Sequence, residues 1–512
     1  INQAYLKLRK QLKPYLYTWI YRSLNGEAIV RPLFIDFPHE QINYTEQVKH
    51  EFMLGSSILV APITNGQETE KGDSRKNNLY LPDHRTMWID LFTGQKYIGG
   101  RVYNKLTYPT WHLPVFVRGG AIFDLGQRNF VFYPQGKSTI SFYDDNDFTD
   151  FNHNHTETKV SSNLDSSKLT INIDPVKGDF AGMTTELPTN LNIMCDSYPD
   201  SVLVKINDQI IKLQEYGTSD VFEHAKEGYF FNTNYSFMPE FDQYHDAKQT
   251  ALQIKLAKRD ITDSKIEIII QNFNYGGQTL VHSITDSVLH SPKGIIIDSK
   301  KISAHSLTVS WAKLTERVQF EINGILYDGI DGDSFTFHEL MPNTKYLMRM
   351  RYVAGNKVSE WSEPFGAITK KAAIDYAVRG VETICNYPED PKHPVKYLTD
   401  LKLASEWQIK DKFDEEKPLT LVFRFDKIEK LSRMAFVPRN LDRNANPVEV
   451  EIELSNDGHT FKPYGERYTW KADAKNKVIG LRNVSAKAIR MTVYKSSGSS
   501  IAGKEVIFFR EK

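Results

Sequence analysis

The side chains in this sequence that could move protons or hold a cation are carboxylates placed beside predicted strands. Asp36 follows an apolar run at residues 28–35, and His39 and Glu40 come shortly after it. Carboxylates at the end of a buried strand can line a reaction cleft, but they also cap helices and loops. Both interpretations stay open for these three residues, and the capping role is favoured.

A second acidic cluster consists of Asp144, Asp145 and Asp147. Calcium loops place oxygen ligands at set offsets and usually end on a bidentate carboxylate, and no such closing residue is evident. The cluster therefore predicts a solvated turn after a strand. The two cysteines, Cys195 and Cys385, lie far apart, which excludes a disulfide framework and a cysteine-based metal site.

The elements that must position these groups change in type along the chain. Residues 5–24 show apolar side chains at helical spacing, and Pro14 is expected to kink this helix. The continuous apolar run at 28–35 predicts a strand buried on both faces, as in a parallel sheet, and a short helix is expected at 44–53. From residue 56 onward, short strands with turn signals dominate. The fold class is therefore mainly β: the end of an α/β barrel followed by serial β-sandwich domains.

Length and charge narrow the class of protein further. A chain of 512 residues predicts about three to five domains. Lys and Arg together number 64, as do Asp and Glu, so no electrostatic footprint for nucleic acid or an anionic membrane exists. No apolar run of about 18 residues predicts a membrane span. The sequence starts at Ile1 without an initiator Met or a signal peptide, which predicts an internal start and a missing upstream half.

Four motifs in the first 125 residues resemble the end of the catalytic region of glycoside hydrolase family 31. In chain order they are 12–17 (LKPYLY), 30–38 (VRPLFIDFP), 52–62 (FMLGSSILVAP) and 113–122 (LPVFVRGGAI).

The resemblance divides this part of the chain into three domains. It implies that residues 1–55 are the last helix–strand–helix of a (β/α)8 catalytic barrel, that 56–129 form a proximal C-terminal β-sandwich, and that 130–288 form a distal C-terminal β domain. It also implies that the two catalytic Asp residues lie upstream of Ile1, so no catalytic residue is assigned here.

The remaining chain resembles two further kinds of module. Residues 289–370 are similar to a fibronectin type III domain, because Trp311 lies on an early strand and Leu340-x-Pro342-x-Thr344-x-Tyr346 has the spacing of a tyrosine corner. Residues 371–512 are similar to discoidin-like domains (coagulation-factor type C) and so to carbohydrate-binding module family 32. The segments at 437–439, 448–458 and 505–508 carry this second resemblance, although extra residues separate the early Asp from its Trp and weaken any transfer of loops.

The second resemblance implies two sites in the last module. Many such modules hold a structural calcium near the early Asp and a C-terminal Glu, which by position are Asp400 and Glu505. The alternative is that Asp400 caps a turn and Glu505 lies on a surface strand. Arg439 and Asn440 are candidates for binding sugar hydroxyls, since a guanidinium offers a rigid fork of donors, and the alternative for Arg439 is a surface ion pair. Trp407 is a candidate sugar-stacking residue, with a core role favoured.

Two classes of function stay open. The first is the C-terminal portion of a retaining, α-glucosidase-like family 31 enzyme, or of an α-xylosidase or α-N-acetylgalactosaminidase, with the upstream catalytic half as partner. The second is a non-catalytic glycan-binding or adhesin fragment. Both take carbohydrate as ligand, and neither needs a cofactor for catalysis. A secreted or cell-surface location in a bacterium is expected.

Overall fold

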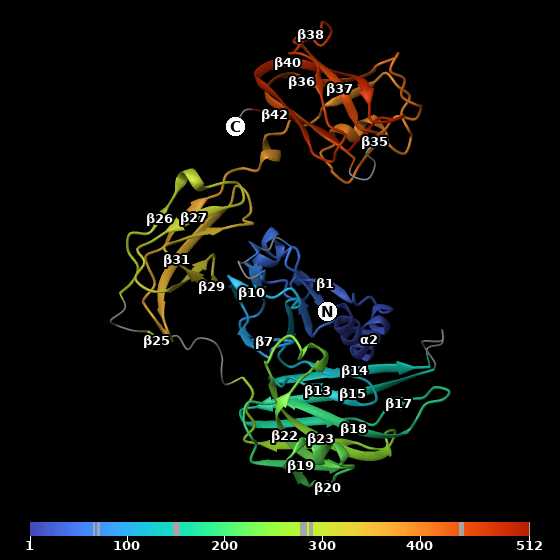
Figure 1. The fold of residues 1–512 in the computed structure, drawn as a ribbon, viewed down its shortest axis with the longest axis vertical. Coiled ribbons are helices and arrows are strands. Elements are labelled where there is room, and N and C mark those ends of the chain that lie inside the picture. Colours follow the sequence, from blue (N-terminus) through green and yellow to red (C-terminus); the bar gives the residue numbers. More distant parts are fainter. Residues whose placement is uncertain are drawn as a thin grey trace. The chain divides into compact units, whose positions relative to one another are not determined.

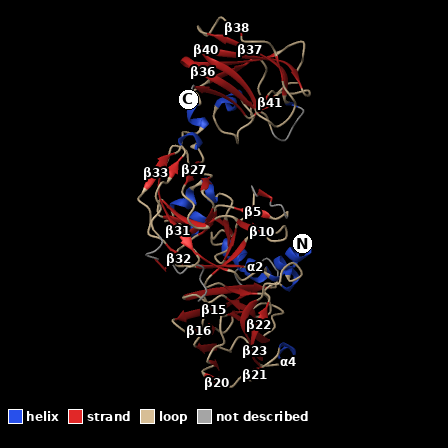
Figure 2. Ribbon diagram, turned by 60° about the vertical axis from the view of Figure 1, so that its left-hand side comes forward, coloured by secondary structure: helices blue, strands red, loops and turns tan. Residues whose placement is uncertain are grey.

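The computed structural model describes residues 1–64, 72–146, 154–276, 290–439 and 445–510, together with the backbone of two short strands between these ranges. The chain divides into two compact units, residues 1–369 and 370–512. Strands dominate both units (Figures 1 and 2), which confirms the predicted mainly β fold. None of the helices in the described ranges is long and apolar enough to cross a bilayer.

Two helices open the first unit, where one kinked helix was expected. They are α1 (Asn2–Gln11) and α2 (Lys13–Ser23), and the break falls at Leu12. Pro14 lies in the first turn of α2, where its missing N–H is not needed for a helical hydrogen bond. The proline therefore starts a helix instead of bending one.

The β2–β3 turn approaches α2 closely at Gly55. This glycine has φ +61°, and a Cβ there would collide with the Tyr15 hydroxyl and the Trp19 indole. Both aromatic side chains are buried, so only glycine fits the turn against this helix.

The prediction of a parallel strand at 28–35 is wrong. β1 (Val30–Pro32) is a short edge strand, antiparallel to β2 (Phe52–Leu54). An edge position suits Pro32, which has no N–H to donate to a ladder. β2 also pairs with β3 (Ile58–Val60), so the sheet runs across the boundary predicted between residues 55 and 56.

The helix expected at 44–53 is also absent from this described segment. α3 (Leu33–Asp36) follows β1 directly, and two 3-10 turns, η1 (Gln41–Tyr44) and η2 (Glu46–Val48), lead into β2.

β1 and β2 belong to a sheet with the strand order β1-β2-β3-β11-β7-β8, and a smaller sheet has the order β10-β5-β4. The other strands are β3 (Ile58–Val60), β11 (Val115–Arg118), β7 (Met87–Asp90), β8 (Lys96–Ile98), β10 (Leu106–Tyr108), β5 (Ser74–Lys76) and β4 (Gln67–Glu68).

Two larger sheets follow, with the orders β12-β13-β18-β23-β22-β21 and β14-β15-β16-β24-β19-β20, and β17 pairs with β15. The first sheet comprises β12 (Ile122–Asp124), β13 (Asn129–Phe132), β18 (Glu186–Met194), β23 (Gln249–Asp260), β22 (Gly228–Tyr235) and β21 (Glu215–Tyr216). The second comprises β14 (Lys137–Asp145), β15 (His155–Asp165), β16 (Lys168–Ile173), β24 (Ile266–Gln271), β19 (Ser201–Ile206), β20 (Gln209–Ile211) and β17 (Lys177–Gly178). A short helix, α4 (Ser219–His224), and a 3-10 turn, η3 (Pro239–Phe241), connect strands of the first sheet.

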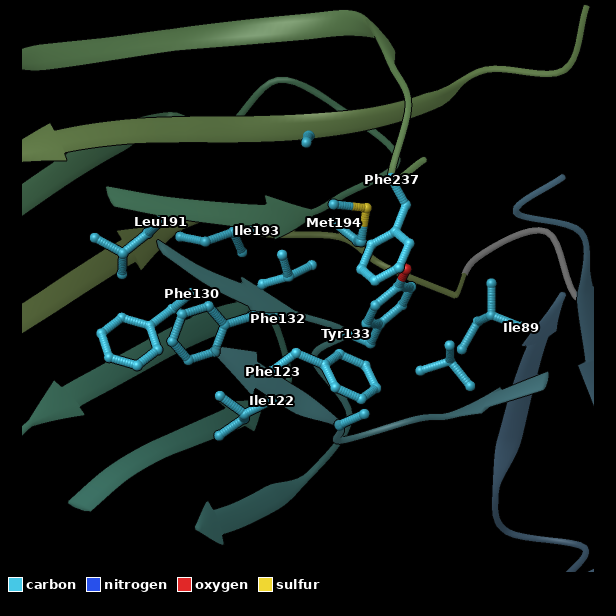
Figure 3. Close-up of a cluster of buried hydrophobic side chains, with 14 of the residues drawn as sticks. Ile89, Ile122, Phe123, Phe130, Phe132, Tyr133, Leu191, Ile193, Met194 and Phe237 are labelled. Atoms are coloured by element: carbon cyan, nitrogen blue, oxygen red, sulfur yellow. The ribbon is translucent and has the colours of Figure 1, made fainter. Parts of the chain in front are cut away.

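Side chains from several sheets of the first unit meet in one apolar core. Figure 3 shows Phe123, Phe130 and Phe132 from adjacent strands grouped with Tyr133 and Phe237. The same core includes apolar residues of α1, α2, β3 and β7. The helices and the two C-terminal β regions therefore pack as one body.

The region predicted as a fibronectin type III domain shares a sheet with the proximal region. Its order is β25-β32-β31-β28-β29-β9-β6, with β33 on β31, and a small sheet has the order β26-β27-β30. β29 (Ile325–Asp331) runs parallel to β9 (Arg101–Tyr103), and the Asn104 N–H donates to the Asp328 carbonyl at 3.2 Å. The remaining strands are β6 (Leu79–Leu81), β25 (Ile284–Thr285), β26 (Ile296–Ile297), β27 (Leu307–Ser310), β28 (Arg317–Ile322), β30 (Ser334–Phe337), β31 (Lys345–Ala354), β32 (Lys357–Val358) and β33 (Phe365–Ile368).

The tyrosine corner predicted at Tyr346 is confirmed in geometry. The Met341 N–H donates to the Tyr346 phenol oxygen at 2.8 Å.

The second unit is a β-sandwich with its own core. Its main sheet has the order β34-β36-β40-β37-β38, with β39 on β37 and β42 on β36, and β35 pairs with β41. These strands are β34 (Glu382–Cys385), β36 (Leu419–Val437), β40 (Lys477–Ser496), β37 (Pro447–Ser455), β38 (Lys462–Pro463), β39 (Tyr468–Thr469), β42 (Glu505–Arg510), β35 (Trp407–Gln408) and β41 (Ala502–Gly503). Two 3-10 turns, η5 (Ala373–Tyr376) and η6 (Val395–Thr399), precede β35.

Candidate functional site

Arg439 lies just beyond the end of β36 and contacts the segment around β35. Its Nε is 2.8 Å from Glu406 Oε2, and its Nη1 donates to Gln408 Oε1 at 2.8 Å. The Arg439 and Glu406 side chains are 24% and 20% exposed, so the pair lies at the surface without being fully solvated. Asn440, the other predicted sugar-binding residue, lies outside the described residues. The ion pair holds the guanidinium fork in one orientation.

Trp407 is a core residue in this structure and not a stacking platform. Its side chain has no exposed surface, and it packs among the apolar residues of the second unit. A sugar ring needs an open aromatic face, which a fully buried indole does not offer. The physical reason is strand alternation: Trp407 faces the core, and its neighbours Glu406 and Gln408 reach Arg439.

Glu406 and Gln408 were missed by the sequence analysis, although a signal for them exists. Side chains directly before and after an inward-facing strand residue point to the opposite face, so a core Trp407 predicts outward neighbours. His393 joins them, since its Nδ1 lies 3.2 Å from the Glu406 carbonyl oxygen. The segment around β35 and the residue after β36 therefore supply a guanidinium, a carboxylate, an amide and an imidazole, which are groups that bind hydroxyls.

Asp400 and Glu505, predicted from the resemblance as a calcium pair, are brought together. The Lys402 N–H donates to Asp400 Oδ1 at 2.9 Å and to Glu505 Oε2 at 3.1 Å. The Leu401 N–H donates to Glu505 Oε1 at 3.2 Å, from a backbone with φ +59°. Ser405 donates its hydroxyl to Asp400. One short loop thus places two carboxylates around a shared amide.

The Glu505 carboxyl is held away from water. It has no exposed surface, and burial, with the nearby Asp400 charge as a further cause, raises the pKa of Glu505 to about 7. The alternative that Glu505 lies on a surface strand is therefore wrong. Two neighbouring carboxylates and a hydroxyl oxygen are donors that suit a hard cation such as calcium. Within the described ranges no cluster of three His, Cys, Asp or Glu side chains forms a metal site, so carbonyl or water oxygens would have to complete one.

In the N-terminal segment, Asp36 is committed to a structural ion pair. Its Oδ2 and Oδ1 accept from Arg31 Nε at 2.8 Å and Nη2 at 2.9 Å. Arg31 is buried and also donates to the Gly55 carbonyl at 3.0 Å. Glu40 Oε1 accepts from the Asp83 N–H at 2.8 Å, and His39 is exposed. Glu40 accepts from a backbone N–H, as the favoured capping role expects, whereas Asp36 pairs with the side chain of Arg31.

The acidic cluster at the end of β14 is organised by phenols. Tyr17 and Tyr143 donate their hydroxyls to Asp145, at 2.9 Å and 2.6 Å. Asp144 Oδ1 accepts from the Asp145 N–H at 3.0 Å, and Asp147 lies outside the described residues. Asp145 is therefore part of a hydrogen-bond network between β14 and α2 instead of a solvated turn.

Comparisons with known proteins give a family match in each of the two units of the chain. Residues 26–123 match the family model "Glycosyl hydrolase family 31 C-terminal domain", and residues 382–506 match "F5/8 type C domain". The chain is 34% identical over 160 residues to an alpha-xylosidase of Saccharolobus solfataricus, covering 28% of this chain and 20% of the relative. It is 30% identical over 159 residues to alpha-glucosidase 2 of Bacillus thermoamyloliquefaciens, covering 28% and 19%.

Among solved structures, the module CBM32-3 from a family 31 glycoside hydrolase of Clostridium perfringens is similar at 20% identity. The match covers 28% of this chain and 99% of that one, with a TM-score of 0.25. The chain spans about a fifth of the length of the two curated relatives named above.

Proposed function

We propose that this chain, whose residues 26–123 carry a glycoside hydrolase family 31 C-terminal domain and residues 382–506 an F5/8 type C domain, is the C-terminal part of a retaining α-glycosidase. The match at 26–123 is the observation that carries the proposal. α-Glucosidase-like hydrolysis is the first candidate activity, and α-xylosidase or α-N-acetylgalactosaminidase activity is the alternative.

The N-terminal segment supports an upstream catalytic half as its partner. Around α2, β1 and α3 it exposes large apolar side chains. They are Ile20, Leu24, Val30, Phe34, Ile35 and Tyr44, each at least 39% exposed. Phe34 and Tyr44 stack on each other with ring centroids 5.5 Å apart. An apolar surface of this kind gains free energy when another apolar surface covers it, and a catalytic barrel is the occupant we propose.

The carboxylates described above support placing the reaction in that upstream half. Retaining hydrolysis needs two carboxylates about 5 Å apart that both reach the glycosidic bond. Asp36 is held by Arg31, and Glu505 beside Asp400 is fully buried and does not reach a substrate. The proposed role of this chain is therefore to complete and support the catalytic domain and to bind glycan.

The test compares the 512-residue chain with a longer product of the same gene. Both are incubated with aryl α-glucoside, α-xyloside and α-N-acetylgalactosaminide. We expect turnover of one substrate by the longer product and none by this chain alone. Turnover by this chain alone would refute the upstream location of the carboxylates. Glycan binding without turnover by the longer product would support the adhesin alternative.

We propose that the second unit binds a glycan through Arg439 and its neighbours Glu406, Gln408 and His393. The guanidinium offers donors, and the carboxylate and amide offer acceptors, so the cluster can hold vicinal hydroxyls. A glycan array probed with wild type and Arg439→Gln tests this role. Equal signals from both proteins would contradict it.

The same unit is proposed to hold a structural calcium ion at Asp400 and Glu505, and residues 289–370 are proposed to be a fibronectin type III domain. The geometry of Tyr346 supports the second assignment. Glycan-binding modules also support a secreted or cell-surface location in a bacterium. Fractionation of the source cells tests the location, and recovery of the protein only from the cytosol would contradict it.

A further inference from the structure

A cavity of about 440 Å³ lies in the first unit, between α2, the β12–β13 turn, β14, the start of β15 and the segment 180–187. The groups that line it include Lys13, Asp124, Arg128, Asp145, Phe180 and Thr184. α2 packs against β14, as Figure 1 shows, so the cavity walls come from elements far apart in sequence. The catalytic and glycan-binding proposals above make no use of this cavity.

Arg128 is the unusual group in this cavity. It is 5% exposed, and its Nε donates to Thr189 Oγ1 at 3.0 Å. Its Nη1 and Nη2 are buried and have no hydrogen-bond partner in the described structure. A buried donor without an acceptor costs about 1–3 kcal/mol, and more when it is charged. The arrangement is explained if a ligand supplies the missing acceptors.

The backbone of the turn also departs from ordinary values at this place. Gln127 and Arg128 have φ +52° and +59°, a left-handed region that non-glycine residues seldom adopt. The turn carries Arg128, whose side chain is buried. Positive φ at two successive positions is typical of the tight turns that join antiparallel strands such as β12 and β13.

The charges around the cavity select the class of ligand. Three carboxylates, Asp124, Asp144 and Asp145, line it against two cations, Lys13 and Arg128. An anion that paired with Arg128 would therefore meet an excess of negative charge. A neutral molecule with several hydroxyls can accept from the guanidinium and donate to a carboxylate at the same time.

Apolar contacts and space agree with such a molecule. Phe180 and Met183 are half-buried side chains on one wall, and they could contact the C–H surface of a sugar ring. Asp124, which also lines the cavity, is an acceptor held by the Gly126 N–H at 2.9 Å.

We propose that this cavity binds a neutral carbohydrate, with neighbouring hydroxyls accepting from Nη1 and Nη2 of Arg128 and donating to Asp124. The site is separate from the glycan-binding cluster of the second unit and does not depend on the proposed glycosidase activity. It would give the chain a second contact to a long glycan.

Ligand-observed NMR titration of the full chain tests the proposal. The probes are D-glucose, D-galactose, D-xylose, N-acetyl-D-galactosamine, acetate and inorganic phosphate. All titrations use an Arg439→Gln background, so that the cluster in the second unit does not contribute. Thr184→Trp places a bulky side chain at an exposed position that lines the cavity, and Thr185→Trp is the matched control, since Thr185 is also exposed and does not line the cavity. Arg128→Gln removes the donors themselves.

We expect at least one sugar to bind, with at least tenfold weaker binding in the Thr184→Trp and Arg128→Gln variants and no change in Thr185→Trp. Both threonine variants change exposed positions, so the test stands even if Arg128→Gln fails to fold. The proposal is overturned if no sugar shows binding that Thr184→Trp weakens. It is also overturned if acetate or phosphate alone binds with this dependence.

Discussion

Replacing Glu505 with Gln gives the sharpest test of the two-carboxylate arrangement in the second unit. Burial raises the pKa of Glu505 to about 7 from an ordinary 4.5, so the folded protein binds this proton more tightly than the unfolded chain does. The free energy of unfolding is therefore highest below about pH 4.5, falls as the pH rises to about 7, and then stays low. The shift corresponds to a loss of about 3 kcal/mol.

The Gln side chain carries no charge at any pH, so this loss disappears in the variant. It keeps one oxygen for the N–H groups of Leu401 and Lys402 and gives up the other, which costs about 1 kcal/mol. Without a divalent cation, we expect Glu505→Gln to be less stable than wild type by about 1 kcal/mol near pH 4.5 and more stable by about 2 kcal/mol near pH 8.

Calcium should reverse the order near pH 8 if the pair holds a cation. At a hundredfold excess over its dissociation constant, calcium would stabilise the wild type by about 2.7 kcal/mol. The variant has lost one charged ligand and should gain much less. When the free energy of unfolding is plotted against pH, the curves of wild type and Glu505→Gln therefore cross in EDTA but do not cross in calcium.

Cysteine alkylation measures the unfolding of the two units separately. Cys385 lies in the second unit and Cys195 in the first, and burial raises the pKa of each thiol, to about 11 and 12, which slows reaction in the folded state. The full chain is titrated with urea at several pH values and pulsed with an alkylating agent, and each labelled peptide is quantified by mass spectrometry.

Glu429→Gln is the matched control for this experiment. Glu429 binds Arg510 through two hydrogen bonds of 2.7 Å, and this partner lowers the pKa of Glu429, so its contribution is lost as the pH falls. Two results would refute the reasoning. One is a wild-type free energy of unfolding, measured at Cys385 in EDTA, that does not fall between about pH 4.5 and 7. The other is a parallel fall for Glu505→Gln.

Three further substitutions follow from the described contacts. Asp36→Ala leaves Arg31 buried without its carboxylate, and we expect the Cys195 transition to lose about 3 kcal/mol; an unchanged transition would contradict a structural ion pair. Gly55→Ala places a Cβ against two buried aromatic side chains at positive φ, so we expect little soluble protein, and a normal yield with a native transition would contradict the close approach. Arg439→Gln should weaken glycan binding at least tenfold, about 1.4 kcal/mol, with the Cys385 transition changed by less than about 1 kcal/mol, as for an exposed ion pair; loss of folding instead would assign it a structural role.

Sequence patterns were sufficient for the features that depend on local alternation or on a motif. Short strands with turn signals predicted the mainly β fold, and the spacing around Tyr346 predicted its corner. The apolar run at 28–35 shows why other features were missed. Apolar side chains on both faces require apolar neighbours, but the sequence does not say whether those neighbours belong to a parallel sheet or to a surface that another domain covers. Structure was needed to show Val30 exposed on an edge strand.

Of the candidate sites, one was predicted from the sequence and another became visible only in the structure. The proximity of Asp400 and Glu505 was predicted from a family resemblance. Glu505 contacts Leu401 and Lys402, which precede it by 104 and 103 positions, and sequence spacing alone does not predict contacts over such separations. The sequence does not indicate a site at Arg128, because arginine is usually an exposed residue. Arg128 is buried on the β12–β13 turn and lines a cavity together with α2 and β14, which are distant from it in sequence.

The parallel ladder between β9 and β29 has a consequence for synthesis of the chain. Asn104 and Asp328, which are joined across this junction, lie 224 residues apart. At the usual rate of translation, the ribosome needs roughly 10 to 45 seconds to make that interval. During this time β9 has one open edge, and open edges invite pairing with other chains. Slower elongation or a missing chaperone should therefore trap newly made molecules as aggregates, even when the finished protein is stable.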